Sequence, residues 1–198
     1  TTYALRPEGI EWPLREDGLP SFRLEDLTAA NGISHTAAHD ALSDVHATIA
    51  LARLIKERQP KLYDYVLHHR DKRSVLAQLD IAAMKPVLHV SGMFGARRHN
   101  IALVVPLAAH PVNKNEIICF DLGANPQILC DLAVEQLQEL LYTRTEDLPE
   151  GTPRLGLKSI HINRCPIVLT PKMADPATAQ RLGISGDQCR KHLEALRG

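Results

Sequence analysis

Apolar residues recur at helical spacing in the first third of the chain. Residues 38–58 are predicted to form a helix that Pro60 ends, because proline cannot continue one. The apolar positions of this helix are Leu42, Val45, Ile49, Ala52 and Leu54. A shorter helix is expected over residues 24–30, where Asn31-Gly32 provides a left-handed stop. Residues 1–22 contain five glycines and prolines and are predicted to form a loop.

The pattern changes after residue 60. Helical spacing over residues 62–79, in two pieces that meet near Asp71, is followed by short runs rich in Val and Ile. The strand-like runs are residues 87–90, 101–107, 116–121 and 167–169, and further helices are expected over 132–141, 175–182 and 185–196. We therefore predict the end of an α/β domain in residues 1–59. A small β-rich domain with added helices should follow in residues 60–198.

Composition excludes several classes of protein. The chain has no apolar run near the length that a membrane helix needs, so we expect no membrane association. Its four cysteines form no C-x-x-C pair, which argues against a structural zinc site and favours reduced thiols in a cytoplasmic protein. Net charge is zero, but residues 1–60 carry three excess acids and residues 61–198 three excess bases. Such an asymmetry fits metal chemistry beside a polyanion, although ordinary surface charge explains it equally well.

The stretch from His39 to Asp44 carries the most specific chemistry. A histidine lies five residues before an aspartate at the start of a predicted helix. The carboxylate can bind a divalent cation, and the histidine can act as a general base on a water. By itself this spacing is common, and a capping histidine beside a solvated aspartate is the simpler interpretation. His35 and His39 also have the spacing of a helical metal pair, but no third ligand is evident.

The residues around this pair change the interpretation. The segment resembles the third acidic motif of the DEDDh-type 3′→5′ exonucleases, and its flanks resemble the bacterial exonuclease I family in particular. The residues that carry the resemblance are 5–10, 12–13, 21–27, 31–33, 39–45 and 47–50. The β-rich remainder resembles the SH3-like domain of that family, so the likeness spans nearly the whole chain.

The resemblance implies a ribonuclease H-like catalytic fold with two Mg²⁺ ions, which hydrolyses single-stranded DNA from the 3′ end to mononucleotides in repair and recombination. By motif position, His39 is the general base, Asp44 a metal ligand and Arg23 a phosphate contact. The family also implies a single-stranded DNA-binding protein (SSB) as a partner, whose acidic tail suits a basic, partly apolar pocket. We expect a monomer.

Other basic residues are candidates for contacts with DNA. Lys72 follows the predicted helix break, Lys114 lies in a turn, and Lys158 is expected on the polar face of a possible strand. Each has a simpler interpretation as ordinary solvated surface. Aromatic residues are few and give no independent support for binding of single strands.

One departure from the family pattern leaves alternatives open. The family uses four carboxylates, and this chain contains no D-x-E motif. We therefore expect the N-terminal sheet strands to be absent from this chain and the isolated chain to be inactive, since Asp44 alone cannot hold two metals. A non-catalytic module that binds single-stranded DNA or SSB is the main alternative. An RNA-trimming relative is a third, against which the added domain argues.

Overall fold

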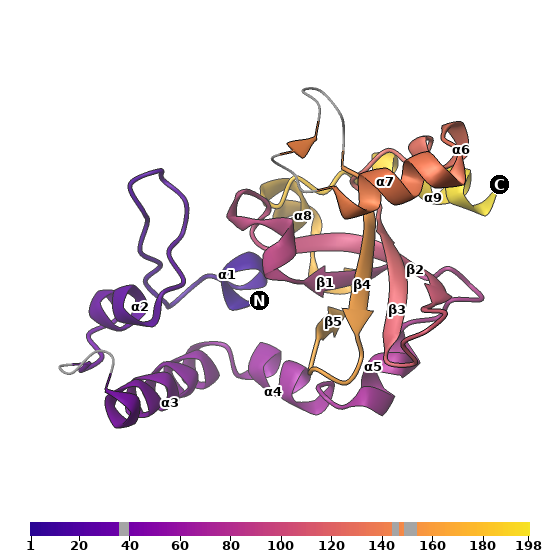
Figure 1. Cartoon of the computed structure of the whole chain (residues 1–198). Helices are drawn as coiled ribbons and strands as arrows, with labels where there is room; N and C mark the ends of the chain where they lie inside the picture. The colour runs from indigo at the N-terminus through magenta and orange to yellow at the C-terminus, as the bar shows by residue number, and fades with distance from the viewer. Residues whose placement is uncertain (36–39, 144–146, 149–153) are drawn as a thin grey trace.

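The computed structural model describes residues 1–35, 40–143, 147–148 and 154–198. His39 lies outside these ranges. The centre of the molecule is one antiparallel sheet whose strands run in the order β4-β3-β2-β1-β5. The strands are β1 (Val87–Val90), β2 (Ile101–Ala109), β3 (Glu116–Asp121), β4 (Leu157–His161) and β5 (Ile167–Leu169). Figure 1 shows the sheet curled, with helices around it.

A shift in register bends the longest strand. Residues 101–104 of β2 pair with β1, and residues 104–109 pair with β3, with an irregularity between Pro106 and Ala108. Proline has no N–H to donate, and it lies beyond the part of β2 that pairs with β1. The bulge therefore allows β2 to pair with β1 on one side and with β3 on the other while the sheet curls.

Three apolar clusters hold short helices against the sheet. Helix α5 (Lys72–Gln78) contributes Val75 to the first cluster. Helices α1 (Thr2–Leu5) and α4 (Pro60–His68) place Leu5 and Leu62 in the second, beside which the 3₁₀ turn η4 (Pro171–Met173) and α8 (Pro176–Arg181) lie. Helix α9 (Gly186–Arg197) buries Cys189 in the third, against Phe120. The remaining elements of this part are α6 (Ile128–Asp131), α7 (Val134–Tyr142), η1 (Gly92–Phe94) and η2 (Ala96–Arg98).

Two helices lie apart from the sheet. Helices α2 (Leu24–Ala30) and α3 (Ala41–Arg58) pack on each other, and α4 joins them to the rest of the molecule (Figure 1). Helix α3 leaves one apolar stripe in solvent, formed by Leu42, Val45 and Ile49, which are 65%, 53% and 43% exposed. The periodicity that predicted this helix therefore does not mark a face buried within the described part of the chain.

Most predicted elements are confirmed, with four corrections. Residues 1–22 are not all loop, because α1 occupies Thr2–Leu5. The long helix begins at Ala41 rather than near residue 38, because Asp40 is an extended N-cap whose carboxylate accepts from the Ser43 N–H. Strand β2 continues to Ala109, two residues beyond the prediction. The predicted helix over 132–141 begins at Val134, after the separate turn of α6.

Within the described ranges, no helix has both the length and the apolar content to cross a membrane. All four cysteines are free.

Candidate active site and nucleic-acid interface

Asp44 lies on the first turn of α3, where the helix start fixes its backbone. Its N–H donates to the Asp40 carbonyl at 2.9 Å, within the turn that Asp40 caps. The Asp44 side chain is 42% exposed. The backbone of Asp44 is therefore fixed, while its carboxylate oxygens remain accessible to a metal ion.

His35 holds this carboxylate from the preceding loop. Its ring nitrogen Nε2 lies 2.7 Å from Oδ1 of Asp44, and the His35 side chain is only 6% exposed. Because an ionised carboxylate only accepts hydrogen bonds, the ring is the donor. Nδ1 of His35 lies 3.5 Å from the hydroxyl of Thr28, a buried residue of α2 whose hydroxyl donates to the Glu25 carbonyl. Helix α2 thus orients the ring that orients Asp44.

The structure brings together only some of the predicted site residues. Arg23 is the exposed N-cap of α2, the helix that packs on α3, and therefore belongs to the same lobe as Asp44. His39, the predicted base, lies outside the described residues. The roles of Arg23, His39 and Asp44 stay predictions.

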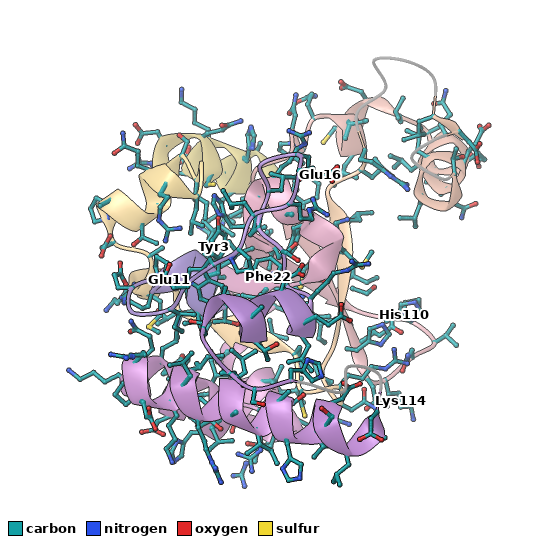
Figure 2. All side chains as sticks on the ribbon, turned by 90° about the vertical axis from the view of Figure 1, so that its left-hand side faces the viewer. Tyr3, Glu11, Glu16, Phe22, His110 and Lys114 are labelled. Atoms are coloured by element: carbon teal, nitrogen blue, oxygen red, sulfur yellow. The ribbon has the colours of Figure 1, made fainter. Side chains whose placement is uncertain are left out.

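The three lysines predicted to contact DNA lie on the β-rich part of the molecule. Lys72 donates to Oδ1 of Asn115 at 2.7 Å, which places it beside Lys114 in the hairpin between β2 and β3. Figure 2 shows Lys114 and His110 on this hairpin. Both lysines are exposed.

The position expected for Lys158 is wrong. It lies in β4, but it is half-buried rather than on an open polar face, and its ammonium is 5.9 Å from the centre of the Phe94 ring. Burial lowers the pKa of Lys158. Alternation in fact places Lys158 on the same face of β4 as Ile160, which is fully buried, and the Phe94 ring of η1 lies against the Lys158 side chain there.

Two features of the structure could not be predicted from residue spacing. The spacing of His35 and His39 suggests a zinc pair, whereas in the structure the His35 ring contacts Asp44. Arg98 forms a bidentate ion pair with Asp121, which no spacing indicates because 23 residues separate them. Among the residues with described positions, no group of three or more His, Cys, Asp or Glu could hold a metal.

Comparison with known proteins defines the class. Residues 70–198 match the family model described as the exonuclease I SH3-like domain. Exodeoxyribonuclease I of Escherichia coli K12 is 51% identical over 195 residues, which is 98% of this chain and 41% of that protein.

Solved structures extend the comparison to the arrangement in space. The zinc ion bound form of the E. coli ExoI–ssDNA complex is 50% identical, with a TM-score of 0.94. An ExoI/SSB-Ct complex is 49% identical, with a TM-score of 0.92. Each alignment covers 99% of this chain and 42% of the other. The chain belongs to the exonuclease I family, and the predicted fold, the helical end of the exonuclease domain followed by an SH3-like domain, is confirmed.

The chain spans about two-fifths of the length of the curated relatives it matches. The division between residues 59 and 60 stays a prediction; the family model begins at residue 70.

Proposed function

We propose that the complete protein hydrolyses single-stranded DNA from the 3′ end to mononucleotides, and that it acts in DNA repair and recombination. One observation carries the proposal. A half-open carboxylate, Asp44, is held on the first turn of α3 by His35 in a chain 51% identical to an exodeoxyribonuclease I. We also propose that the protein acts in the cytoplasm.

The residues present fit a metal in part. The Asp44 carboxylate offers the oxygen donor that Mg²⁺ prefers, and the family includes a structure with a bound metal ion, zinc. We propose Mg²⁺ as the physiological metal, with Asp44 as one ligand and the other carboxylates in the part of the relatives that this chain does not match. Two such ions, if bound, would supply Lewis acidity that activates a water and stabilises negative charge on the departing oxygen. His39 would accept the proton of that water.

The β-rich part would form one wall of the path to this site. A backbone phosphate would be contacted by Arg23, at the start of α2, and further phosphates by Lys72 and Lys114 on the β-rich part. Such a wall would exclude duplex DNA and retain the strand between cleavage steps. Because phosphate contacts release counterions, affinity for the strand should fall steeply as salt rises.

A partner site is proposed where basic and apolar side chains meet. A cavity of about 530 Å³ lies beside α4 and η4, with Arg6 and Lys61 next to Leu62, Tyr65 and Met173. Arg6 is held there by a bond to the Met173 carbonyl at 3.2 Å. This combination suits an acidic, partly apolar tail such as that of SSB, and a relative forms an SSB-Ct complex. Arg6→Ala should weaken binding of an SSB C-terminal peptide to the protein, and unchanged affinity would locate the tail elsewhere.

The substrate class is tested with 5′-labelled oligomers of matched sequence. We expect the protein with Mg²⁺ to shorten single-stranded DNA from the 3′ end, and to leave blunt duplex DNA and single-stranded RNA largely intact. Faster shortening of RNA than of DNA would favour the RNA-trimming alternative. Cleavage of the label in one step from the 5′ end would contradict the proposed direction.

A second function is favoured for this chain taken alone. Its described residues contain no group of three metal-binding side chains, so we propose that the isolated chain binds single strands or SSB without cleaving DNA. Retained binding in EDTA, together with no shortening in Mg²⁺, is the expected result. We also propose that the protein is monomeric, which sedimentation would test.

A further inference from the structure

A second cationic site lies in the SH3-like part, away from Asp44. A cavity of about 540 Å³ opens where η1 and β4 meet the turn that follows β3. Three cationic side chains and one carboxylate line it: Arg98, Arg154, Lys158 and Asp121. The excess of positive charge in a recess favours an anionic ligand.

The carboxylate is already neutralised by one of these cations. Asp121, whose side chain is 5% exposed, accepts from both terminal nitrogens of Arg98, and its Oδ1 also accepts from the Gly123 N–H at 2.9 Å. A guanidinium has five N–H donors, so this pair leaves donors of Arg98 without a partner in the described structure. The Arg98 side chain is 43% exposed, fixed in place and still able to bind an anion.

Lys158 is the cation that this arrangement leaves without an acceptor. Its ammonium lies over the Phe94 ring but makes no hydrogen bond or ion pair with any residue of described position. Burial is the main cause that lowers the pKa of Lys158; Asp121 raises this pKa, and Arg154 and Arg98, each with a smaller effect than Asp121, lower it. A half-buried ammonium beside two other cations is unfavourable when the cavity holds only water. An anion bound there would relieve both the burial and the repulsion.

The remaining walls are apolar. Phe94, Leu155 and Leu157 line the cavity, and the Phe94 ring also has Arg98 over it at 5.6 Å. A ligand with an anionic group and an apolar body matches such a site better than inorganic phosphate alone. The volume lies within the ordinary range of small-molecule sites.

We propose that this cavity binds a nucleotide through its phosphate, with Lys158 and Arg98 as the donors. The choice of a nucleotide rests on the proposed exonuclease function, whereas the preference for an anion rests on the cavity itself. Two sources share this chemistry: a released mononucleotide, or a phosphodiester of the bound strand.

Calorimetric titration in EDTA, where metal-dependent cleavage cannot proceed, tests the site and separates the sources. The probes are dAMP and an oligothymidylate, and the variants of the protein are Lys158→Met, Lys158→Arg and, as control, Lys191→Met on the exposed side of α9. We expect Lys158→Met to weaken binding about tenfold, the loss of one charged hydrogen bond, while Lys158→Arg and Lys191→Met retain it. A loss seen with dAMP identifies the mononucleotide, and a loss confined to the oligomer identifies the strand.

Equal binding of both probes by Lys158→Met and the unaltered protein would overturn the proposal, as would no binding of either probe. Thermal melting of each variant identifies any that is unfolded. If Lys158→Met does not fold, Lys158→Arg still tests the site, because it keeps the positive charge and should retain binding. Cleavage by the protein is scored separately. If binding depends on Lys158 but the protein does not cleave DNA, the proposed exonuclease activity is refuted, whereas the proposed nucleotide site at Lys158 is supported.

Discussion

At the scale of single residues, the contact that matters most for function is that between His35 and Asp44. A buried ring with one nitrogen on a carboxylate and the other near Thr28 has little freedom to turn. Groups that orient a metal ligand in this way commonly change metal affinity or activity by about 10- to 100-fold when removed. We therefore propose that His35 is a positioning residue for Asp44.

Loss of the His35 ring should weaken the response to metal. We expect His35→Ala to raise the Mg²⁺ concentration for half-maximal cleavage by about tenfold, and His35→Gln, which keeps a donor, to restore part of the difference. Mn²⁺ binding followed by electron paramagnetic resonance gives a readout independent of cleavage. His46→Ala, an exposed site on the same helix, is the control. The same Mg²⁺ concentration for half-maximal cleavage in the unaltered protein and all three variants would contradict a positioning role for His35.

Burial of one thiol predicts a dependence of stability on pH. Burial raises the pKa of Cys119 from 9.0 to about 12, so above pH 9 the unfolded chain releases a proton that the folded protein retains. The free energy of unfolding should therefore decrease as pH rises from 9 toward 12, by about 1.4 kcal/mol per unit from this group. Urea unfolding across that range should show a shallower decrease for Cys119→Ala than for Cys130→Ala, whose thiol is exposed. Parallel decreases would contradict the assignment.

At the scale of elements, α3 has an apolar stripe that nothing in the described chain covers. Leu42, Val45 and Ile49 are spaced to meet one surface, yet all three are exposed. We expect the sheet of the ribonuclease H-like domain, which the family resemblance places before this segment, to cover them. The stripe is then a buried interface of the complete protein.

This expectation predicts different effects of one substitution in two settings. In the complete protein, Val45→Ser should lower the free energy of unfolding by about 2 kcal/mol, the value of a buried valine. In this chain alone it should change by less than about 0.5 kcal/mol, as for exposed sites. Denaturation of both, with Arg53→Ser as the exposed control, checks the difference. Equal effects in the two settings would mean that the stripe stays in solvent.

Helix boundaries could be predicted from the sequence where neighbouring residues alone determine them. Helix α2 was placed from residue 24 to 30 because Asn31-Gly32 ends it locally. Helix α1 was missed because four residues between a terminus and Pro7 show no period. The start of α3 depended on which polar residue caps it, and the cap is Asp40.

The site divides in the same way. Asp44 could be named as a candidate because its motif is contiguous in sequence, whereas the contacts of His35 with Asp44 and of Lys158 with Phe94 join residues that are distant in sequence. The role of His39 rests on the motif alone. Local spacing predicts chemistry, and tertiary contacts decide which groups can perform it.

At the scale of the whole molecule, the proposed function is divided between two parts of the chain. The α2–α3 lobe carries Asp44 and Arg23, and the curled sheet with its helices carries Lys72, Lys114 and the cavity at Lys158 (Figure 1). Figure 2 shows the side of the molecule on which the hairpin of Lys114 and the loop of Phe22 are both visible. A strand held by the second part would be delivered to the first.

We propose that Asp44 is required for metal-dependent shortening of single-stranded DNA from the 3′ end. The most direct test is a cleavage ladder on a 5′-labelled oligonucleotide, made with the complete protein in Mg²⁺ and in EDTA. We compare the unaltered protein with Asp44→Ala and with Asp64→Ala, an exposed carboxylate on α4. We expect progressive shortening that requires Mg²⁺, is slowed at least about 100-fold in Asp44→Ala, and persists in Asp64→Ala. Equal shortening by Asp44→Ala, or shortening in EDTA, would contradict it.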